Sequence, residues 1–96
     1  MKKFLFIYNA SGQEDGGTDA EWMAWFQSIG AHVVDIGNPI QGGTLVKSAQ
    51  VSELSSKSDL VGGYSLINAK DIEEAATLAK NCPGKAGVRI FETIPM

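Results

Sequence analysis

The stretch that decides the fold is DLVGGYSLINAKDIEEAATLAKNCP, residues 59–83. Its first part, through Ile67, is apolar and β-rich, which predicts a strand. The second part predicts a helix that begins near Asn68 or Asp71 and ends before Pro83. Five apolar residues share one face of this helix, and they are Ile72, Ala75, Ala76, Ala79 and Cys82. The alanines allow this helix to approach a sheet closely.

The glycine pair in this stretch raises the question of a phosphate-binding loop. Such a loop places glycines after a strand and before a helix, so that backbone N–H groups converge on the anion. Here Gly62 and Gly63 come before the strand core, and NAK leads into the helix. We therefore expect a bulge or a close backbone approach instead of a nucleotide site.

The N-terminal third predicts a second strand–helix pair. Residues 4–8, FLFIY, are apolar at both parities, so this strand needs cover on both faces. Thr18 and Glu21 have the capping-box spacing, and the helix is expected to end at Gly30. Four apolar residues form its stripe, at i, i+3, i+4 and i+7: Trp22, Trp25, Phe26 and Ile29.

The remaining segments complete the order of elements. Residues 31–37 predict a short strand, 44–54 a further strand or hairpin arm, 55–59 a turn, and 87–94 the last strand. The order β-α-β, arm, β-α-β predicts one α+β domain over residues 1–96, a ferredoxin-like split βαβ fold with both helices on one face of an antiparallel sheet. The other face lacks cover, so we expect a homodimer in which two sheets form an α+β barrel.

Composition excludes several function classes. The chain has 96 residues, a net charge of −3 and no Lys/Arg cluster, which argues against a nucleic-acid partner. The apolar run at residues 4–8 is too short for a signal peptide, and no segment has the length of a membrane span. A single cysteine indicates a reducing compartment, so a cytoplasmic location is expected. One histidine and one cysteine give no structural zinc site, and we expect neither a metal nor a cofactor.

The chain resembles the YCII-related domain family, including its DGPF-type branch. The resemblance is carried by KFLFIY at 3–8, GNP at 37–39, residues 61–83 and the terminal IPM. It implies a ferredoxin-like dimer that forms an α+β barrel. Much of that family has no assigned reaction, and a few relatives act on small aromatic compounds.

Two features depart from the family pattern. The DGPF motif would fall before Val61, where this chain has SSKSDL. Some relatives are thought to use a His–Asp pair with the histidine on the first helix, and that helix has no histidine here. Trp22, Met23 and Trp25 occupy that region. The resemblance therefore supports the fold more than it supports catalysis.

The candidate site residues are polar-tipped or aromatic side chains within apolar elements. We expect Tyr8 and Arg89 to face a cavity between two sheets, near Tyr64 or His32, with Phe4 and Phe6 on the same face as Tyr8. On this interpretation Leu5, Ile7, Val88 and Ile90 pack under the helices. Trp22 and Phe26 are expected in the core, whereas Trp25 is a candidate for an aromatic wall.

For three further candidates, His32, Asp35 and Asn38, the local structure alone is a sufficient explanation. His32 and Asp35 could form a base and its orienting carboxylate, but a spacing of three on a strand points them to opposite faces. Asn38 lies in a segment that could cover a cavity or simply form a turn. Arg89 would favour a carboxylate or phenolate ligand.

Three functions remain open from the sequence. The first is a homodimeric YCII-type domain that binds a small aromatic or anionic molecule between its sheets. The second is a cofactor-free lyase or oxygenase-like enzyme acting on a small aromatic substrate. The third is a regulatory module that binds another protein.

Overall fold

A computed structural model of the chain describes residues 1–10, 16–54 and 61–96. The turn expected at 55–59, and with it the position of the missing DGPF motif, lies outside the described residues. The elements in chain order are β1 (Lys2–Asn9), α1 (Asp19–Ser28), the 3₁₀ helix η1 (Gly30–His32), β2 (Val33–Asp35), β3 (Thr44–Lys47), β4 (Gln50–Glu53), β5 (Val61–Ala69), α2 (Ile72–Ala79) and β6 (Val88–Glu92).

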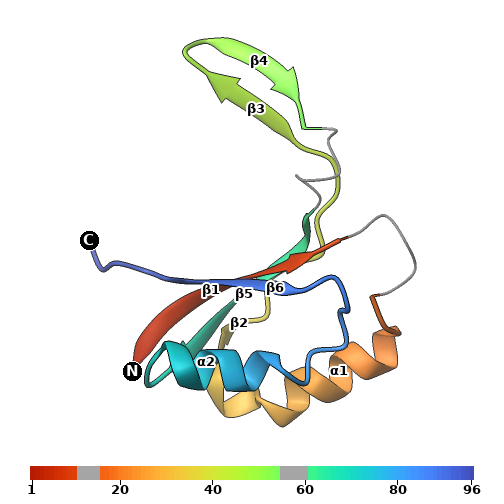
Figure 1. The fold of residues 1–96 in the computed structure, drawn as a ribbon, viewed down its shortest axis with the longest axis vertical. Coiled ribbons are helices and arrows are strands. Elements are labelled where there is room, and N and C mark those ends of the chain that lie inside the picture. Colours follow the sequence, from red (N-terminus) through yellow and green to blue (C-terminus); the bar gives the residue numbers. More distant parts are fainter. Residues whose placement is uncertain (11–15, 55–60) are drawn as a thin grey trace.

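Four strands form one sheet in the order β2-β5-β1-β6, and every neighbouring pair is antiparallel. Each helix therefore connects two strands that have a third strand between them, which is the split βαβ arrangement. Both helices lie against the same face of the sheet (Figure 1). The predicted α+β class is confirmed, and the topology is compatible with a ferredoxin-like fold.

Side-chain caps fix where the two helices begin. The Thr18 side chain accepts a hydrogen bond from the Glu21 N–H at 3.1 Å, and the Glu21 carboxylate accepts one from the Thr18 N–H at 2.9 Å. This is the predicted capping box, which satisfies two of the N–H groups that a helix start leaves free. Asp71 caps α2 by accepting from the Glu74 N–H at 2.9 Å.

The core lies between the sheet and the helices. Phe4, Phe6 and Tyr8 of β1 are buried there, with Trp25 and Ile29 of α1. The expectation that Phe4, Phe6 and Tyr8 face away from the helices is wrong. The alanine-rich α2 contributes little side-chain volume, so large aromatic rings fill the space beneath the helices. On β6 the expectation that Val88 and Ile90 pack under the helices is confirmed.

Val88 and Ile90 pack against this core, and Arg89 and Phe91 lie on the opposite face. That opposite face, which we call the open face, carries a row of apolar residues. Leu5 pairs with Leu66 of β5 and with Phe91 of β6 across the sheet. Phe91 is 51% exposed.

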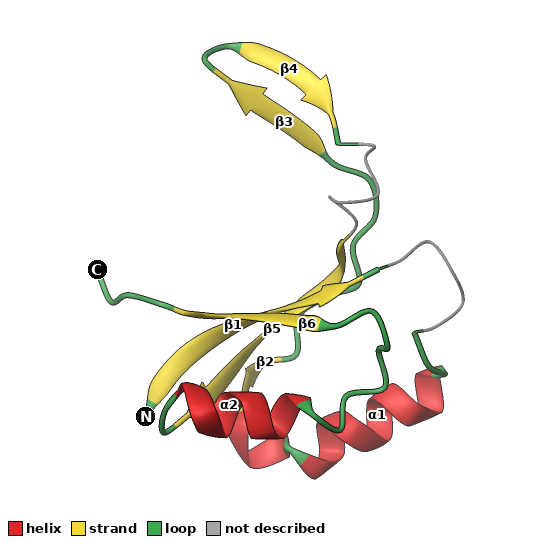
Figure 2. Cartoon of the chain, in the orientation of Figure 1, coloured by secondary structure: helices red, strands yellow, loops and turns green. Residues whose placement is uncertain are grey.

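The remaining two strands, β3 and β4, form a separate hairpin, as the sequence allowed. It stands clear of the sheet on the side that faces away from the helices (Figure 2). Ser48 and Ala49 both have positive φ, 50° and 69°, as a two-residue type I′ turn requires. Every residue of both strands is exposed. We call this hairpin, residues 44–53, the arm.

Candidate functional site

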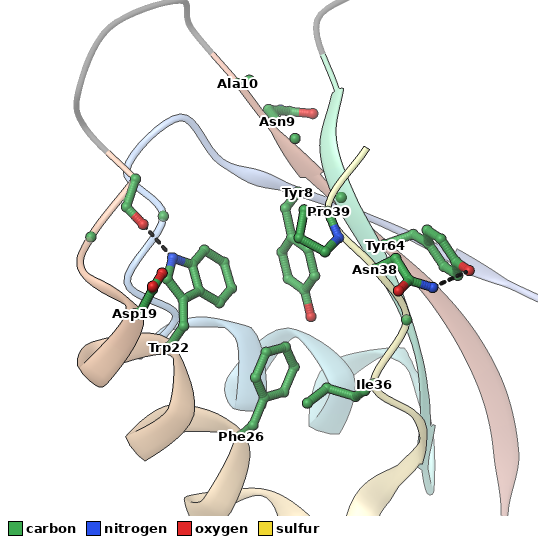
Figure 3. Close-up of a pocket in the computed structure, with 16 residues that line it drawn as sticks. Tyr8, Asn9, Ala10, Asp19, Trp22, Phe26, Ile36, Asn38, Pro39 and Tyr64 are labelled. Carbon is green, nitrogen blue, oxygen red and sulfur yellow. Dashed lines mark hydrogen bonds between the residues drawn. The ribbon is translucent and has the colours of Figure 1, made fainter. Parts of the chain in front are cut away.

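A pocket of about 440 Å³ lies between the N-terminal half of α1 and the adjoining ends of β1 and β5. The segment from Ile36 to Pro39 forms its far side (Figure 3). We call it the α1 pocket. Backbone contributes much of the lining, because six of the lining residues are glycines: Gly16, Gly17, Gly37, Gly62, Gly63 and Gly84.

Three aromatic rings form the apolar wall of the α1 pocket. Tyr8 and Trp22 meet edge to face with ring centroids 4.9 Å apart, and Phe26 lies 5.9 Å from Trp22 and 6.4 Å from Tyr8. The Trp22 indole N–H donates to the Gly16 carbonyl, which holds the ring in place. Edge-to-face contacts of this kind add to the stabilisation from burial, so the wall is fixed before any ligand arrives.

A hydrogen-bond chain orients Tyr8 at the base of the pocket. Its hydroxyl donates to Ser65 Oγ at 2.9 Å, and Ser65 Oγ donates to the Ile36 carbonyl at 2.6 Å. Ser65 is fully buried. Burial raises the pKa of Tyr8, since charge is disfavoured away from water. The phenol is therefore neutral and acts as the donor in this chain.

Backbone contacts with β5 position the segment from Ile36 to Pro39. The Asp35 carboxylate accepts from the Gly37 N–H at 2.9 Å, and the Tyr64 N–H donates to the Asn38 carbonyl at 3.3 Å. Gly37 has φ +74°, and a Cβ there would lie 1.8 Å from the Tyr64 carbonyl oxygen. Only glycine fits at this position.

The glycine pair of β5 has the structural role predicted for it. The pairing of β1 with β5 shifts between Tyr8 and Asn9, and Gly62 falls at the irregularity. A Cβ on Gly63 would lie 3.0 Å from the Asn38 carbonyl oxygen. The pair thus marks a bulge and a close backbone approach, and it lines the pocket without preceding a helix.

The structure brings together three of the candidate site residues. Tyr8, Asn38 and Tyr64 all line the α1 pocket. The Asn38 amide nitrogen donates to the Tyr64 hydroxyl at 3.4 Å (Figure 3). Tyr8 lies on the helix-covered face of the sheet, so the expectation that it shares a face with Arg89 is wrong.

The other four candidates lie elsewhere. Trp25 is 4% exposed, and its indole N–H donates to the Leu78 carbonyl of α2 at 3.1 Å, so it belongs to the core. His32 Nδ1 lies 3.0 Å from the Asn68 carbonyl oxygen. Asp35 bonds the Gly37 N–H, and no hydrogen bond joins it to His32 among the described residues. Arg89 Nε donates to Asn9 Oδ1 at 2.7 Å on the open face.

Sequence reasoning missed the pocket's main aromatic residues. Trp22 and Phe26 were expected in the core; both are partly buried against it, and they also line the pocket. Trp25, expected at the edge of the stripe, is buried. All three belong to one helical stripe, so spacing alone does not separate them. Asp19, which follows the cap residue Thr18, also lines the pocket and was not among the candidates from sequence.

Other chemistry-bearing groups give no second site. Cys82 is a buried free thiol, and burial raises its pKa, as for a structural side chain. Within residues 1–10, 16–54 and 61–96, no three or more His, Cys, Asp or Glu residues are grouped in a way that could hold a metal ion. Neither α1 nor α2, nor any other helix of the described residues, has the length and hydrophobicity needed to cross a membrane.

Two comparisons with known proteins were negative. A scan against protein-family models finds no match to the chain, and a search of curated proteins finds no match either.

Proposed function

We propose that the protein is a homodimeric YCII-related domain that binds a small aromatic molecule in the α1 pocket. The observation that carries the proposal is the pocket itself, which has an aromatic wall of three rings and a volume of about 440 Å³. Ligand pockets of small molecules have this size, and they combine apolar walls with few polar groups. The sequence suggested a site between two sheets, and we place it beneath α1 instead.

Binding fits the lining better than catalysis does. The side chains in the lining that can titrate are Tyr8, Asp19 and Tyr64. Tyr8 is a neutral phenol whose proton bonds Ser65, so it is poorly suited to act as a base. His32 and Asp35 bond to separate backbone groups and form no base–carboxylate pair. The alternative of a cofactor-free lyase or oxygenase therefore has no supporting pair of residues in this pocket.

The surface area supports the homodimer. The chain has a mass of 10.2 kDa and exposes 6851 Å², whereas a compact monomer of this mass exposes about 5,300 Å². Its radius of gyration is 14.3 Å, against about 12.5 Å for a compact chain of this length. The excess of about 1,500 Å² is more than the roughly 800 Å² that each partner buries in a standard interface. We propose that the open face, with Leu5, Leu66 and Phe91, is the centre of that interface.

The cysteine content indicates in which cellular compartment the protein acts. Cys82 is the single cysteine of the chain, and it is buried as a free thiol. Unpaired thiols persist in reducing compartments. We therefore propose that the protein acts in the cytoplasm.

The binding proposal is tested by calorimetry with small aromatic alcohols and phenols, compared between two variants of α1. Trp22→Leu removes one ring of the wall and should abolish measurable binding. Met23→Leu is the control, because Met23 is exposed on the same helix and does not line the pocket. Equal affinity in Trp22→Leu, Met23→Leu and the wild type would overturn the proposal.

A further inference from the structure

We propose that the α1 pocket takes an aromatic amine, a flat ring whose polar group donates hydrogen bonds. This inference rests on the proposed function and adds the chemical class of the ligand. It depends on which hydrogen-bonding capacity the lining side chains still have once their bonds within the chain are made. Tyr8, Asn38 and Asp19 offer acceptors to the pocket.

Tyr8 is an acceptor towards the pocket. A phenol has one proton, and that of Tyr8 is donated to Ser65 Oγ. The direction of this bond is unambiguous. Ser65 Oγ must donate its own proton to the Ile36 carbonyl, which can only accept. The remaining lone pair of the Tyr8 oxygen is therefore available to a donor on the ligand.

The other polar side chains have committed part of their donors to bonds within the chain. The Asn38 amide nitrogen bonds Tyr64, and its oxygen lies on the side of Tyr8 and Pro39 (Figure 3). Trp22 donates its N–H to Gly16. Asn9 accepts from Arg89 and donates to the Ala86 carbonyl, so Asn9 and Asn38 each keep one amide hydrogen. The Tyr64 hydroxyl accepts from Asn38, and its own proton is a further donor.

The pocket has one formally charged lining residue among the described residues, and it is negative. Asp19 is in the lining and lies beside the Trp22 indole (Figure 3). Arg89, which suggested a carboxylate or phenolate ligand from sequence, is outside the lining and points to Asn9. An ammonium group near Asp19 would gain an ion pair, and its alkyl-aromatic body would contact Trp22 and Phe26. A carboxylate in the same place would be repelled.

The test uses three probes of similar size: 2-phenylethylamine, 2-phenylethanol and phenylacetate, titrated against the whole chain by NMR. We expect the amine to bind about fivefold more tightly than the alcohol, the factor that an exposed ion pair supports. Phenylacetate should bind more weakly than both. Asp19→Asn should remove the preference for the amine over the alcohol. Glu73→Gln is the matched control, since Glu73 is an exposed first-turn carboxylate of α2 away from the pocket.

The outcomes separate the ligand class from the pocket. Phenylacetate binding as tightly as the amine would overturn the inference and leave the proposed function standing. A preference for the amine that survives in Asp19→Asn would also overturn it, because the charge assigned to the effect would then be wrong. If none of the three probes perturbs the pocket at millimolar concentration, the proposed function fails together with the inference.

A separate observation concerns the arm. We propose that the arm of one protomer packs on a second copy of the chain, which extends the proposed dimer beyond the open face. Val46 and Val51 form a cross-strand pair and are 65% and 69% exposed. Leu45 and Leu54 are exposed as well. An isolated two-stranded hairpin is at best marginally stable in water, so this one needs a surface to pack on.

The position of the arm is consistent with packing on a second copy of the chain. The arm and the open face lie on the same side of the sheet, away from the helices (Figures 1 and 2). A partner seated on the open face would therefore come within reach of the arm, whose four-residue strands extend roughly 13 Å. The contact would occur twice in a two-fold dimer. It would account for part of the exposed area that exceeds one standard interface.

Removing the arm tests this directly. The Leu54 N–H donates to the Gly43 carbonyl at 3.1 Å, so residues 44–53 can be replaced by an Asn-Gly turn without moving the ends. We expect this variant to sediment as a monomer at concentrations where the wild type is a dimer. Its far-ultraviolet circular dichroism should keep the signal of the main sheet and helices. An unchanged dimer would overturn the arm contact and leave the open-face dimer intact.

A finer variant keeps the hairpin. Val46→Thr with Val51→Thr preserves β-branching and removes apolar surface, and it should weaken the dimer about tenfold. Lys47→Thr with Gln50→Thr is the control on the neighbouring pair of the same hairpin. Equal dissociation constants for the two double variants would contradict the role of the valines. A wild type that is itself monomeric would overturn both the arm contact and the proposed dimer.

Discussion

The hydroxyl of Tyr8 donates to Ser65 Oγ at 2.9 Å, and this bond joins two strands across 57 positions of sequence. It connects the pocket base to the buried side of β5. Ser65→Ala would leave the Tyr8 hydroxyl and the Ile36 carbonyl without their partner, at a cost of about 1–3 kcal/mol in unfolding free energy. Tyr8→Phe in the same chain should recover part of that loss. Urea denaturation of the two single variants and the double variant measures the coupling, and strictly additive effects would contradict the bond.

The alkaline stability should depend on Tyr8. Its pKa in the folded protein is raised above the ordinary value of 10.0 by burial. The neutral phenol therefore stabilises the fold below pH 10, and this contribution is lost as pH rises towards the folded pKa. The unfolding free energy of the wild type relative to Tyr8→Phe should be about 1.4 kcal/mol lower at pH 11 than at pH 8. Parallel pH profiles for the two proteins would show that Tyr8 is not buried as described.

Gly37 and Gly42 provide a test position and a control for the placement of the segment from Ile36 to Pro39. Both have positive φ, 74° and 68°. A Cβ on Gly37 would overlap the Tyr64 carbonyl, whereas a Cβ on Gly42 would have no atom within 4 Å. Gly37→Ala should cost more than about 3 kcal/mol, and Gly42→Ala about 1 kcal/mol from backbone strain alone. Similar losses in thermal denaturation would mean that the segment from Ile36 to Pro39 does not lie against β5.

The open face should carry the dimer contact. Phe91→Ser should produce a monomer, because it removes a large exposed ring from the centre of the proposed interface. Met23→Ser is the control, since Met23 is 52% exposed, about as much as Phe91 at 51%, and lies on α1 away from the open face. Sedimentation equilibrium at micromolar concentration distinguishes the two. Loss of the dimer in both variants, or in neither, would remove the open face from the interface.

Local signals in the sequence predicted the helices and strands in their order, but they did not predict the 3₁₀ helix η1 (Gly30–His32). That helix takes the start of the strand expected at 31–37, so His32 does not lie on a strand. The capping box of Thr18 and Glu21 and the glycine pair before Tyr64 each have a short-range cause, and each was predicted. Which set of β1 side chains faces the helices was not predictable. Both alternating sets are apolar, so the pattern of the strand favours neither. The volume that decides it is set by α2, which is distant in the sequence.

The pocket itself depends on contacts that local patterns do not contain. Its far wall is held by Gly37 against Tyr64, and its base by Tyr8 and Ser65. Trp22 and Trp25 have the same apparent role in a helical wheel. They differ in their hydrogen bonds. The Trp25 indole N–H donates to the Leu78 carbonyl of α2, whereas the Trp22 indole N–H donates to the Gly16 carbonyl beside the pocket.

The α1 pocket is tested most directly by the two indole N–H signals in a ¹H–¹⁵N NMR spectrum. The chain has two tryptophans, and Trp22→Phe identifies which signal belongs to the pocket. Titration with the neutral probe 2-phenylethanol should shift the Trp22 signal and leave the Trp25 signal in place, because Trp25 is buried and bonded to Leu78. A Trp22 signal that stays unmoved at millimolar probe would contradict a small-molecule site beneath α1.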